Sequence, residues 1–345
     1  MTARLDVDLD VFAANLRVIR ERVVPARHML VVKDDAYGHG LASIVRRAAA
    51  EGVDWFGAFD IVTGLAVRDE APEARVFSWL VGSVADARAG IDADLDLGVG
   101  DLALLEDVAE AARQAGRPAR VHLKIDTGLH RNGIRPEEWD AAVGRAAELE
   151  GEPSIVVEGI WSHIAEASDA EDDAARALFD DAVHRAERAG LRPRVRHLSA
   201  SAASFERPEF RYDLARVGAF AYGIRPAGGP GEEELGIRPV GVLRADVVQA
   251  GDEGAVLDIG SLDGVPSSLA GRARVSTPGG RRRVREIAPD SMTIEAWPDA
   301  AAGQSVVVWG GDAPSATDHA ELIGTIGEEI AVRLSPLVPR RYRGA

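Results

Sequence analysis

Lys33 is a residue whose type and position could do chemistry. It ends a predicted strand, His28–Lys33, and the chain then turns through Gly38 and Gly40 into a predicted helix. A lysine at the C-terminal end of a strand can be desolvated, lose its proton and form a Schiff base with an aldehyde. Taken alone, Lys33 fits a surface lysine that simply follows a strand better than a catalytic one.

Four later segments also carry cationic, imidazole or hydroxyl side chains at or just after predicted strands. They contain Lys124 with Arg131, then His163, Ser201 and Arg216. Taken alone, the first is a charged loop beside a Thr-Gly turn, and a single histidine after a strand is more often structural than catalytic. The chemistry therefore depends on whether the fold brings these strand ends together.

The elements that would position these residues alternate between short β-rich runs and longer helical stretches. The predicted strands are His28–Lys33, Trp55–Phe59, Arg75–Val81, Leu95–Val99, Ala119–Ile125, Ile155–Ile164, Val195–Leu198 and Leu214–Val217. The predicted helices are Asp10–Val23, Leu41–Glu51, Ile61–Asp69, Leu102–Gln114, Pro136–Leu149 and Asp172–Ala189. Such alternation predicts right-handed βαβ units and a parallel sheet. Eight units in about 220 residues fit an α/β (β/α)8 TIM-like barrel, whose catalytic face is formed by the C-terminal strand ends. A doubly wound open sheet is the competing interpretation.

The pattern changes after Pro226, where Ala227–Gly231 is rich in Gly and Pro and the helical periodicity stops. Short strands separated by turns predict a C-terminal all-β domain. These strands are Val240–Gln249, Ala255–Ile259, Ala273–Ser276, Arg281–Ile287, Ser291–Ala296, Ser305–Trp309 and Gly327–Leu334. We therefore expect a barrel domain over residues 8–226 and a β-domain over residues 232–345, which the N-terminal strand 1–7 joins.

Composition excludes several classes of protein and site. The 345 residues include no Cys, so disulfides, thiol nucleophiles and Cys-ligated metals are excluded, and no metal site is predicted. The net charge of −16 argues against binding to nucleic acid or to anionic membrane. The acidic N-terminus and the absence of a long apolar run predict a cytoplasmic globular protein. The acidic stretch Ala165–Ala175 is expected to be a solvated loop and helix start.

Taken in order, the five segments resemble the motifs of the alanine racemase family, the barrel-type (fold type III) pyridoxal-phosphate enzymes. Val31–Gly40, VVKDDAYGHG, is similar to the family's VVKANAYGHG, and Leu123–Gly133, LKIDTGLHRNG, to LKxDTGMxRxG. Gly159–Ala165, GIWSHIA, is similar to GxxTHFA, His197–Ala203, HLSASAA, to HxxNSAA, and Asp213–Gly223, DLARVGAFAYG, to DxVRxGIxxYG. The resemblance extends over nearly the whole chain.

The resemblance implies pyridoxal 5′-phosphate as the cofactor, with Lys33 as its covalent anchor and as an acid/base. It places Tyr37, Ser201, Gly218 and Ala219 at the cofactor phosphate, Arg131 at the phenolic oxygen, His163 beside the pyridine ring and Arg216 at the pyridine nitrogen. Lys33, Arg131 and His163 are thereby the implied catalytic residues. Lys124 matches a lysine that is carbamylated in some members. Asp34 replaces a small residue of the family motif, and Ala200 replaces an Asn.

The arginine matched by Arg216 has a mechanistic consequence. Because arginine stays protonated in proteins, a ring nitrogen that faces it must accept a hydrogen bond and remain unprotonated. An unprotonated ring is a weaker electron sink. This suits simple removal and return of a Cα proton and discourages side reactions such as transamination.

The resemblance breaks in the β-domain, where the family takes its second base from the partner subunit. That base is a tyrosine in a GYGxT-type segment, but the corresponding Ala250–Ala255, AGDEGA, contains none. The next motif is present as Ile259–Gly264, IGSLDG, while Ala288–Asp290 replaces the family's CMD and Pro336 replaces a phosphate-contacting tyrosine. The four tyrosines, Tyr37, Tyr212, Tyr222 and Tyr342, lie elsewhere. Candidate substitutes for the base are Asp258, Ser261, Asp263 and Asp290.

We therefore expect two-base alanine racemisation to be weak or absent, and the site to admit a bulkier amino acid or amine. The favoured interpretation is a pyridoxal-phosphate-dependent racemase or epimerase that acts through Lys33 on an atypical substrate. The alternatives are a one-base decarboxylase or lyase and a non-catalytic cofactor-binding homologue. The resemblance also implies a homodimer with a composite active site and a small-molecule substrate, without nucleic-acid or membrane partners.

Overall fold

The computed structural model describes residues 2–198 and 200–344, so that Met1, Ser199 and Ala345 lie outside the described residues. The chain forms two compact units. The barrel unit comprises Ile19–Lys33 and Ala48–Gly218, and the β-unit comprises the chain up to Val18, Asp34–Arg47 and the chain from Ala219 onward. Each unit is described separately below.

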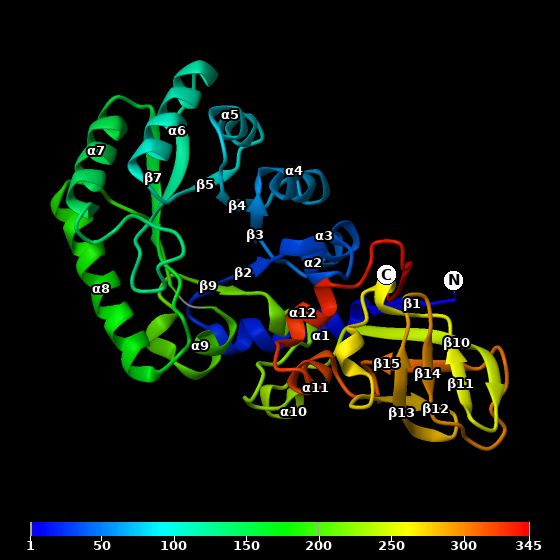
Figure 1. The fold of residues 1–345 in the computed structure, drawn as a ribbon. Helices are drawn as coiled ribbons and strands as arrows, with labels where there is room; N and C mark the ends of the chain where they lie inside the picture. The colour runs from blue at the N-terminus through cyan, green and yellow to red at the C-terminus, as the bar shows by residue number, and fades with distance from the viewer. Residues whose placement is uncertain (1, 199, 345) are drawn as a thin grey trace. The chain divides into compact units, whose positions relative to one another are not determined.

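A parallel eight-stranded sheet forms the centre of the barrel unit, in the order β8-β7-β6-β5-β4-β3-β2-β9 (Figure 1). Its strands are β2 (Arg27–Val31), β3 (Trp55–Asp60), β4 (Arg75–Leu80), β5 (Asp96–Val99), β6 (Ala119–Lys124), β7 (Ile155–Trp161), β8 (Val195–His197) and β9 (Leu214–Val217). The two ends of this order meet where the Asp213 N–H donates to the Arg196 carbonyl at 3.1 Å. The predicted (β/α)8 barrel is therefore confirmed, and an open doubly wound sheet is excluded.

The inside of the barrel is a packed core, as expected for a small barrel whose inward side chains fill it. Its buried apolar members are Met29, Trp55, Phe77, Trp161, Val195 and Leu214. Phe77 packs edge-on against Trp161 at 5.2 Å and against the His197 ring at 5.3 Å between ring centroids. Polar side chains on neighbouring strands are therefore held in a rigid, largely dry environment.

Helices α4 to α8 lie on the outer side of the barrel strands (Figure 1). Apart from α2 (Lys33–Tyr37), whose backbone is left-handed, the α-helices that include barrel-unit residues are α1 (Leu9–Val23), α3 (Leu41–Ala50), α4 (Ile61–Glu70), α5 (Val84–Asp92), α6 (Leu102–Ala115), α7 (Trp139–Gly151), α8 (Asp169–Arg188) and α9 (Ser201–Glu206). Helix α5 is not among the predicted helices, because its buried face contains only Ala87, Gly90 and Ile91 and its apolar periodicity is weak. Among the described residues, no helix has the length and apolarity needed to cross a membrane.

The β-unit contains an eight-stranded sheet in the order β11-β14-β13-β12-β15-β10-β1-β16, with a further pairing of β10 to β11. The strands are β1 (Arg4–Asp8), β10 (Gly241–Gly251), β11 (Gly254–Leu257), β12 (Arg274–Thr277), β13 (Gly280–Ile287), β14 (Met292–Ile294), β15 (Ser305–Trp309) and β16 (Arg340–Arg343). All these pairs are antiparallel except that of β1 with β16. The predicted β-domain is confirmed, and the N-terminal strand belongs to its sheet.

Two expectations for the β-unit are wrong. The predicted strand Gly327–Leu334 is a helix, α12 (Gly327–Val332), and helical structure continues after Pro226 in α10 (Glu232–Leu235) and α11 (Ala316–Glu321). The β-branched Ile330 and Val332 favoured a strand, but the buried residues Gly327, Ile330 and Ala331 follow a spacing of three and four, which places them on one helical face. Strand β16 is absent from the predicted strands.

Replacing His28 with phenylalanine should make the stability of the chain less sensitive to acid. His28 is buried at the start of the barrel, and burial lowers its pKa from 6.5 to about 4. The unfolded chain therefore binds this proton at a higher pH than the folded chain, so stability is lost as pH falls from about 6.5 to about 4. Between pH 7 and pH 4 the wild type should lose about 3 kcal/mol more than His28→Phe. Urea unfolding at a series of pH values measures this difference, and parallel curves would contradict it.

Candidate active site

Lys33 lies at the point where β2 ends and the chain enters a left-handed turn. The side chain is half-buried, and the four residues Asp34–Tyr37 all have φ near +53°. Left-handed backbone costs roughly 1–2 kcal/mol per non-glycine residue, so surrounding contacts must hold this turn. The Gly38 N–H donates to the Asp34 carbonyl at 2.8 Å, and the Leu41 N–H donates to the Asp35 carboxylate at 2.8 Å. The second aspartate thus fixes the beginning of α3, which gives Asp35 a structural role.

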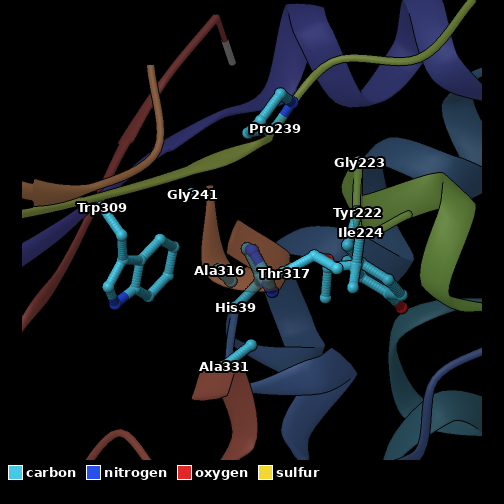
Figure 2. Close-up of a pocket in the computed structure, with 10 residues that line it drawn as sticks. All are labelled: His39, Tyr222, Gly223, Ile224, Pro239, Gly241, Trp309, Ala316, Thr317 and Ala331. Atoms are coloured by element: carbon cyan, nitrogen blue, oxygen red, sulfur yellow. The ribbon is translucent and has the colours of Figure 1, made fainter. Parts of the chain in front are cut away.

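Tyr37, at the end of this turn, belongs to the β-unit and is buried there. Its ring lies 4.8 Å from that of Tyr222, and the ring of His39 lies 5.1 Å from Tyr222 on centroids. Burial raises the pKa of Tyr37 well above its ordinary value, so its hydroxyl is a donor at neutral pH. Figure 2 shows His39 and Tyr222 lining one small pocket, which has a volume of about 10 Å³. That volume holds about one water molecule and no cofactor.

Arg216 is a buried cation of the barrel unit that has four hydrogen-bond acceptors around it. It is 6% exposed, and the two N–H groups of its Nη2 are shared among three acceptors: the carbonyls of Ser162 at 2.8 Å and Leu198 at 2.9 Å, and Nδ1 of His163 at 3.0 Å. Its Nη1 donates to Nδ1 of His197 at 3.1 Å. Burial lowers the pKa of Arg216 to about 9, an effect opposed by the charge of Glu166, so the guanidinium remains a cation at pH 7. These acceptors fix its orientation.

His163 and Lys124 lie within the field of this cation. Burial and then the charges of Arg216 and Arg131 place the pKa of His163 well below 6.5. His163 is therefore neutral, and because its Nδ1 accepts from Arg216, its proton is on Nε2. Lys124 is buried with its Nζ 4.5 Å from the Trp161 ring centroid, and burial followed by Arg216 and Arg131 lowers its pKa to about 8. A substantial neutral fraction of this amine exists slightly above neutral pH.

Arg131 lies on an exposed loop that follows β6. The Asp126 carboxylate organises this loop by accepting from the Gly128 and His130 N–H groups, each at 3.1 Å. Gly133 closes the loop with φ +133°, and a Cβ there would lie 2.8 Å from the Asp126 nitrogen, so a side chain would disrupt the turn. The loop thus sets the position of Arg131 relative to β6.

Ser201 and Gly218 contact each other in the barrel unit. The Gly218 N–H donates to the Ser201 hydroxyl at 3.3 Å, and Ser201 begins helix α9. The Ala203 N–H donates to the Glu166 carboxylate at 3.0 Å, with Glu166 itself at φ +53°. The acidic stretch is therefore a loop and helix start, but Glu166 also folds back onto α9. A carboxylate therefore lies at the first turn of the helix that begins with Ser201, a residue that the resemblance assigns to the phosphate.

In the β-unit, the segment matched to the missing tyrosine is a tight hairpin. Gly251 of β10 pairs with Gly254 of β11, which leaves Asp252 and Glu253 as the exposed turn. Asp263 accepts from the Gly260 N–H at 2.8 Å, and Asp258 accepts from the Thr2 N–H at 2.6 Å. Two of the candidate substitutes therefore have structural contacts.

A second strip of the β-unit carries the other two candidate substitutes, Ser261 and Asp290, both of which are exposed. The Leu262 N–H donates to the Pro289 carbonyl at 2.9 Å, so the two segments lie side by side. Leu262 is 76% exposed. The apolar Leu262 and the acidic Asp290 are therefore both exposed to solvent at the IGSLDG motif.

The structure distributes the predicted site residues between the two units. The barrel unit contains Lys33, Arg131, His163, Ser201, Arg216 and Gly218, and the β-unit contains Tyr37 and Ala219. His163 bonds Arg216 directly, and Ser201 bonds Gly218 directly. The sequence analysis did not single out two residues that contact this set. Glu166 accepts from the Ala203 N–H, and His122 bonds His197, which in turn bonds Arg216. The alternation of His122 with Lys124 on one strand face was the available signal for His122.

Comparison with known proteins agrees with this geometry. Residues 7–226 match the family profile "Alanine racemase, N-terminal domain" and residues 238–342 match "Alanine racemase, C-terminal domain". Alanine racemase of Thermobifida fusca is 36% identical over 370 residues, covering 99% of this chain and 98% of the relative. Alanine racemase of Streptomyces coelicolor is 36% identical over 375 residues, covering 99% and 96%.

Solved structures give the same result. Alanine racemase from D-cycloserine-producing Streptomyces lavendulae is similar with a TM-score of 0.96 at 34% identity, covering 100% of this chain and 98% of that chain. Alanine racemase from Corynebacterium glutamicum gives a TM-score of 0.89 at 30% identity, covering 99% of both chains. The chain belongs to the alanine racemase family, whose members depend on pyridoxal phosphate.

Proposed function

We propose that this chain is a pyridoxal-phosphate-dependent racemase or epimerase of an amino acid other than alanine, with Lys33 as its acid/base. The observation that carries the proposal is the immobilised Arg216. Strand β2, which leads to Lys33, pairs with β9 in the register Met29 to Arg216. The amine and the guanidinium therefore come from neighbouring strands of one rigid barrel, as a reaction at a single carbon requires.

The donor set of the barrel unit fits the cofactor. Bound pyridoxal phosphate supplies an aldehyde and an electron-withdrawing ring. Lys33 would hold the aldehyde carbon, Arg216 the ring nitrogen, Arg131 the phenolic oxygen, and Ser201 with the Gly218 N–H the phosphate. The resemblance adds Tyr37 and Ala219 to the phosphate contacts, and places His163 beside the ring. A cation that keeps its proton at pH 7, as Arg216 does, can only donate to the ring nitrogen.

The groups of this chain have distinct tasks in the proposed reaction. Lys33 would take and return the Cα proton on one face of the substrate. Arg216 would keep the ring nitrogen unprotonated, and His163 would keep Arg216 in place by accepting one of its hydrogen bonds. Neutral His163 adds no further positive charge to a site that already contains Lys33, Arg131 and Arg216. Such a site favours reversible deprotonation over reactions that need a strong electron sink.

The proposal also concerns the face of the substrate Cα opposite Lys33, where racemisation needs a second base. The hairpin Ala250–Ala255 offers carboxylates but no phenol, and Pro336 offers no hydrogen-bond donor. We infer that alanine itself is a poor substrate and that a bulkier amino acid or amine fits. The test is to measure, in deuterated water, which amino acids of a panel exchange their Cα hydrogen with the cofactor-loaded protein. Exchange of none of them would favour a non-catalytic cofactor-binding homologue.

A one-base decarboxylase or lyase is the second candidate function. The hairpin that lacks a tyrosine favours it, because such a reaction needs an acid/base on one face only. Release of carbon dioxide from an amino acid would identify it.

We also propose a homodimer with a composite active site. The support is the family relationship together with the solvent-exposed Leu262 and Asp290 of the β-unit. Sedimentation at micromolar concentration, with Leu262→Asp as the disrupting variant, tests it.

Replacing Glu166 with glutamine should tighten the binding of pyridoxal phosphate about fivefold. The carboxylate bonds the Ala203 N–H beside Ser201, so it would repel a phosphate held there. The effect is limited because Glu166 is exposed and its charge is screened. Absorbance titrations with pyridoxal phosphate and with pyridoxal, which has no phosphate, measure it. Only the former should change, and Glu206→Gln, at the other end of α9, should change neither. Equal affinities of Glu166→Gln and wild type would show that the carboxylate does not face the phosphate.

A further inference from the structure

A row of buried polar side chains crosses the inside of the barrel, on β5, β6, β8 and β9. Its members are Asp96, His122, His197 and Arg216, and none is more than 6% exposed. Arg216 Nη1 lies 3.1 Å from His197 Nδ1, and His197 Nε2 lies 2.8 Å from His122 Nδ1. His122 Nε2 faces Asp96 Oδ2 at 3.6 Å, an electrostatic contact longer than a hydrogen bond. We call Asp96, His122 and His197 the interior polar chain.

The chemistry at the Arg216 end fixes the direction of the hydrogen bonds along the interior polar chain. A guanidinium has donors only, so His197 Nδ1 must accept and the proton of His197 must be on Nε2. That N–H then donates to His122 Nδ1, which leaves the proton of His122 on Nε2. The opposite arrangement would point an N–H of His197 at an N–H of Arg216 and push the guanidinium away.

The chemistry at the Asp96 end of the interior polar chain favours the same direction of hydrogen bonding. Burial alone would raise the pKa of Asp96, but His122, Arg75 and Arg120 together lower it to about 2, so it is a carboxylate. Arg75 Nη2 bonds its Oδ2 at 2.5 Å, and Arg120 bonds its Oδ1. A fixed negative charge beside His122 Nε2 favours a proton on that nitrogen. Both ends therefore specify the same tautomers.

The barrel core is shaped to hold the two imidazoles. His197 stacks on Trp161 with 5.7 Å between centroids and an angle of 6°, and His122 lies 4.7 Å from the Phe77 ring. Gly159 leaves the space that His122 occupies, because a Cβ there would lie 2.3 Å from His122 Nδ1. The glycine of the GIWSHIA segment thus has a defined packing role, and the rings have little freedom to turn.

We propose that His122 and Asp96 are positioning residues that act through His197 to hold the Arg216 guanidinium in its donating orientation at the mouth of the barrel. They touch neither cofactor nor substrate. The inference deepens the proposed function and rests on it for the role of Arg216. The tautomers it requires are nevertheless a property of the chain itself and can be measured without cofactor.

The first test is nitrogen NMR of the protein labelled with ¹⁵N-histidine, without added cofactor, at pH 7.5. We expect the resonances of both His122 and His197 to be those of a neutral ring protonated on Nε2. Assignment uses the variants His122→Asn and His197→Phe. A proton on Nδ1 of either ring, or a charged ring, would overturn the proposal.

The second test compares the binding of pyridoxal phosphate to three variants by absorbance titration. His122→Phe keeps an aromatic ring but removes the acceptor, and we expect about tenfold weaker binding, as is typical for loss of an outer-shell partner. His122→Asn restores an oxygen near the Nδ1 position and should recover most of the affinity. His28→Phe is the matched control, a buried histidine outside the interior polar chain, and should bind as the wild type does. Unchanged binding by His122→Phe would overturn the proposal.

The two tests separate failure of this inference from failure of the proposed function. If the wild type binds no pyridoxal phosphate, the proposed function fails, while the NMR still decides the tautomers. If the wild type binds it and His122→Phe binds equally well, only the positioning role fails. If His122→Phe does not fold, the NMR of the wild type and the affinity of His122→Asn remain decisive, since the latter should stay within about threefold of the wild type.

Discussion

Replacing Lys33 with alanine should abolish covalent attachment of pyridoxal phosphate and lower Cα proton exchange about a thousandfold or more. The chain has only two lysines, Lys33 and Lys124, so the attachment site is a choice between two amines. Lys33 is half-buried at the end of β2, beside the strand that carries Arg216. Borohydride reduction of the loaded protein followed by peptide mass spectrometry measures the site directly. We expect the label on the peptide that contains Lys33.

Lys124 is the competing amine in this labelling experiment. Its pKa is lowered to about 8, so more of its amine is neutral at pH 7 than for an ordinary lysine. However, it is 6% exposed, with its amine against the Trp161 ring, and burial denies it access to an aldehyde. Lys124→Met should therefore keep the label on Lys33. A label on Lys124, or a Lys33→Ala protein that retains the long-wavelength absorbance of the loaded enzyme, would refute the assignment.

Exchange of the Cα hydrogen should exceed inversion of configuration by about 10²–10⁴-fold for alanine. A positioned general acid or base contributes a factor of this size. The proposal matches Ala250–Ala255 to the family segment that carries the second base, and this segment is a hairpin whose turn is Asp252 and Glu253. L- and D-alanine and a panel of larger amino acids are incubated with the loaded protein in deuterated water. Proton NMR gives the exchange rate, and chiral chromatography gives the inversion rate.

The pattern across the panel distinguishes the candidate functions. A larger amino acid that inverts as fast as it exchanges would show that a second base exists for that substrate. Asp290→Asn and Asp263→Asn then locate the base, because only the true base should lower inversion while leaving exchange of one enantiomer intact. Equal rates of exchange and inversion with alanine would contradict the prediction that alanine is racemised poorly.

Much of the fold was predictable because it depends on local pattern. The eight barrel strands are short apolar runs bounded by turn residues, and all eight are present within a few residues of their predicted positions. The errors occur where local pattern is ambiguous. Ile330 and Val332 are β-branched in a segment that tertiary contacts make helical, and α5 buries mainly small residues that leave little periodicity.

The candidate site was predictable only in part. Lys33, Arg131, His163, Ser201 and Arg216 are candidate site residues from sequence because they follow strands and match motifs of the family. Glu166 was assigned to a solvated loop, since nothing in its neighbours shows that it returns to the Ala203 N–H. His122 was overlooked because its partner His197 is 75 residues away in sequence.

The sequence by itself determined the family, the barrel followed by a β-domain, the presence of only two lysines and the absence of a tyrosine in the segment Ala250–Ala255. Each of these depends on residue types and on their order along the chain. Tertiary structure alone decided which donor meets which acceptor and which side chains are buried. It set the four acceptors around Arg216, the tautomers that these impose on His163 and His197, and the burial of Lys124. Hydrogen-bond direction and desolvation depend on distances between residues that are remote in sequence, and only the closed barrel sets those distances.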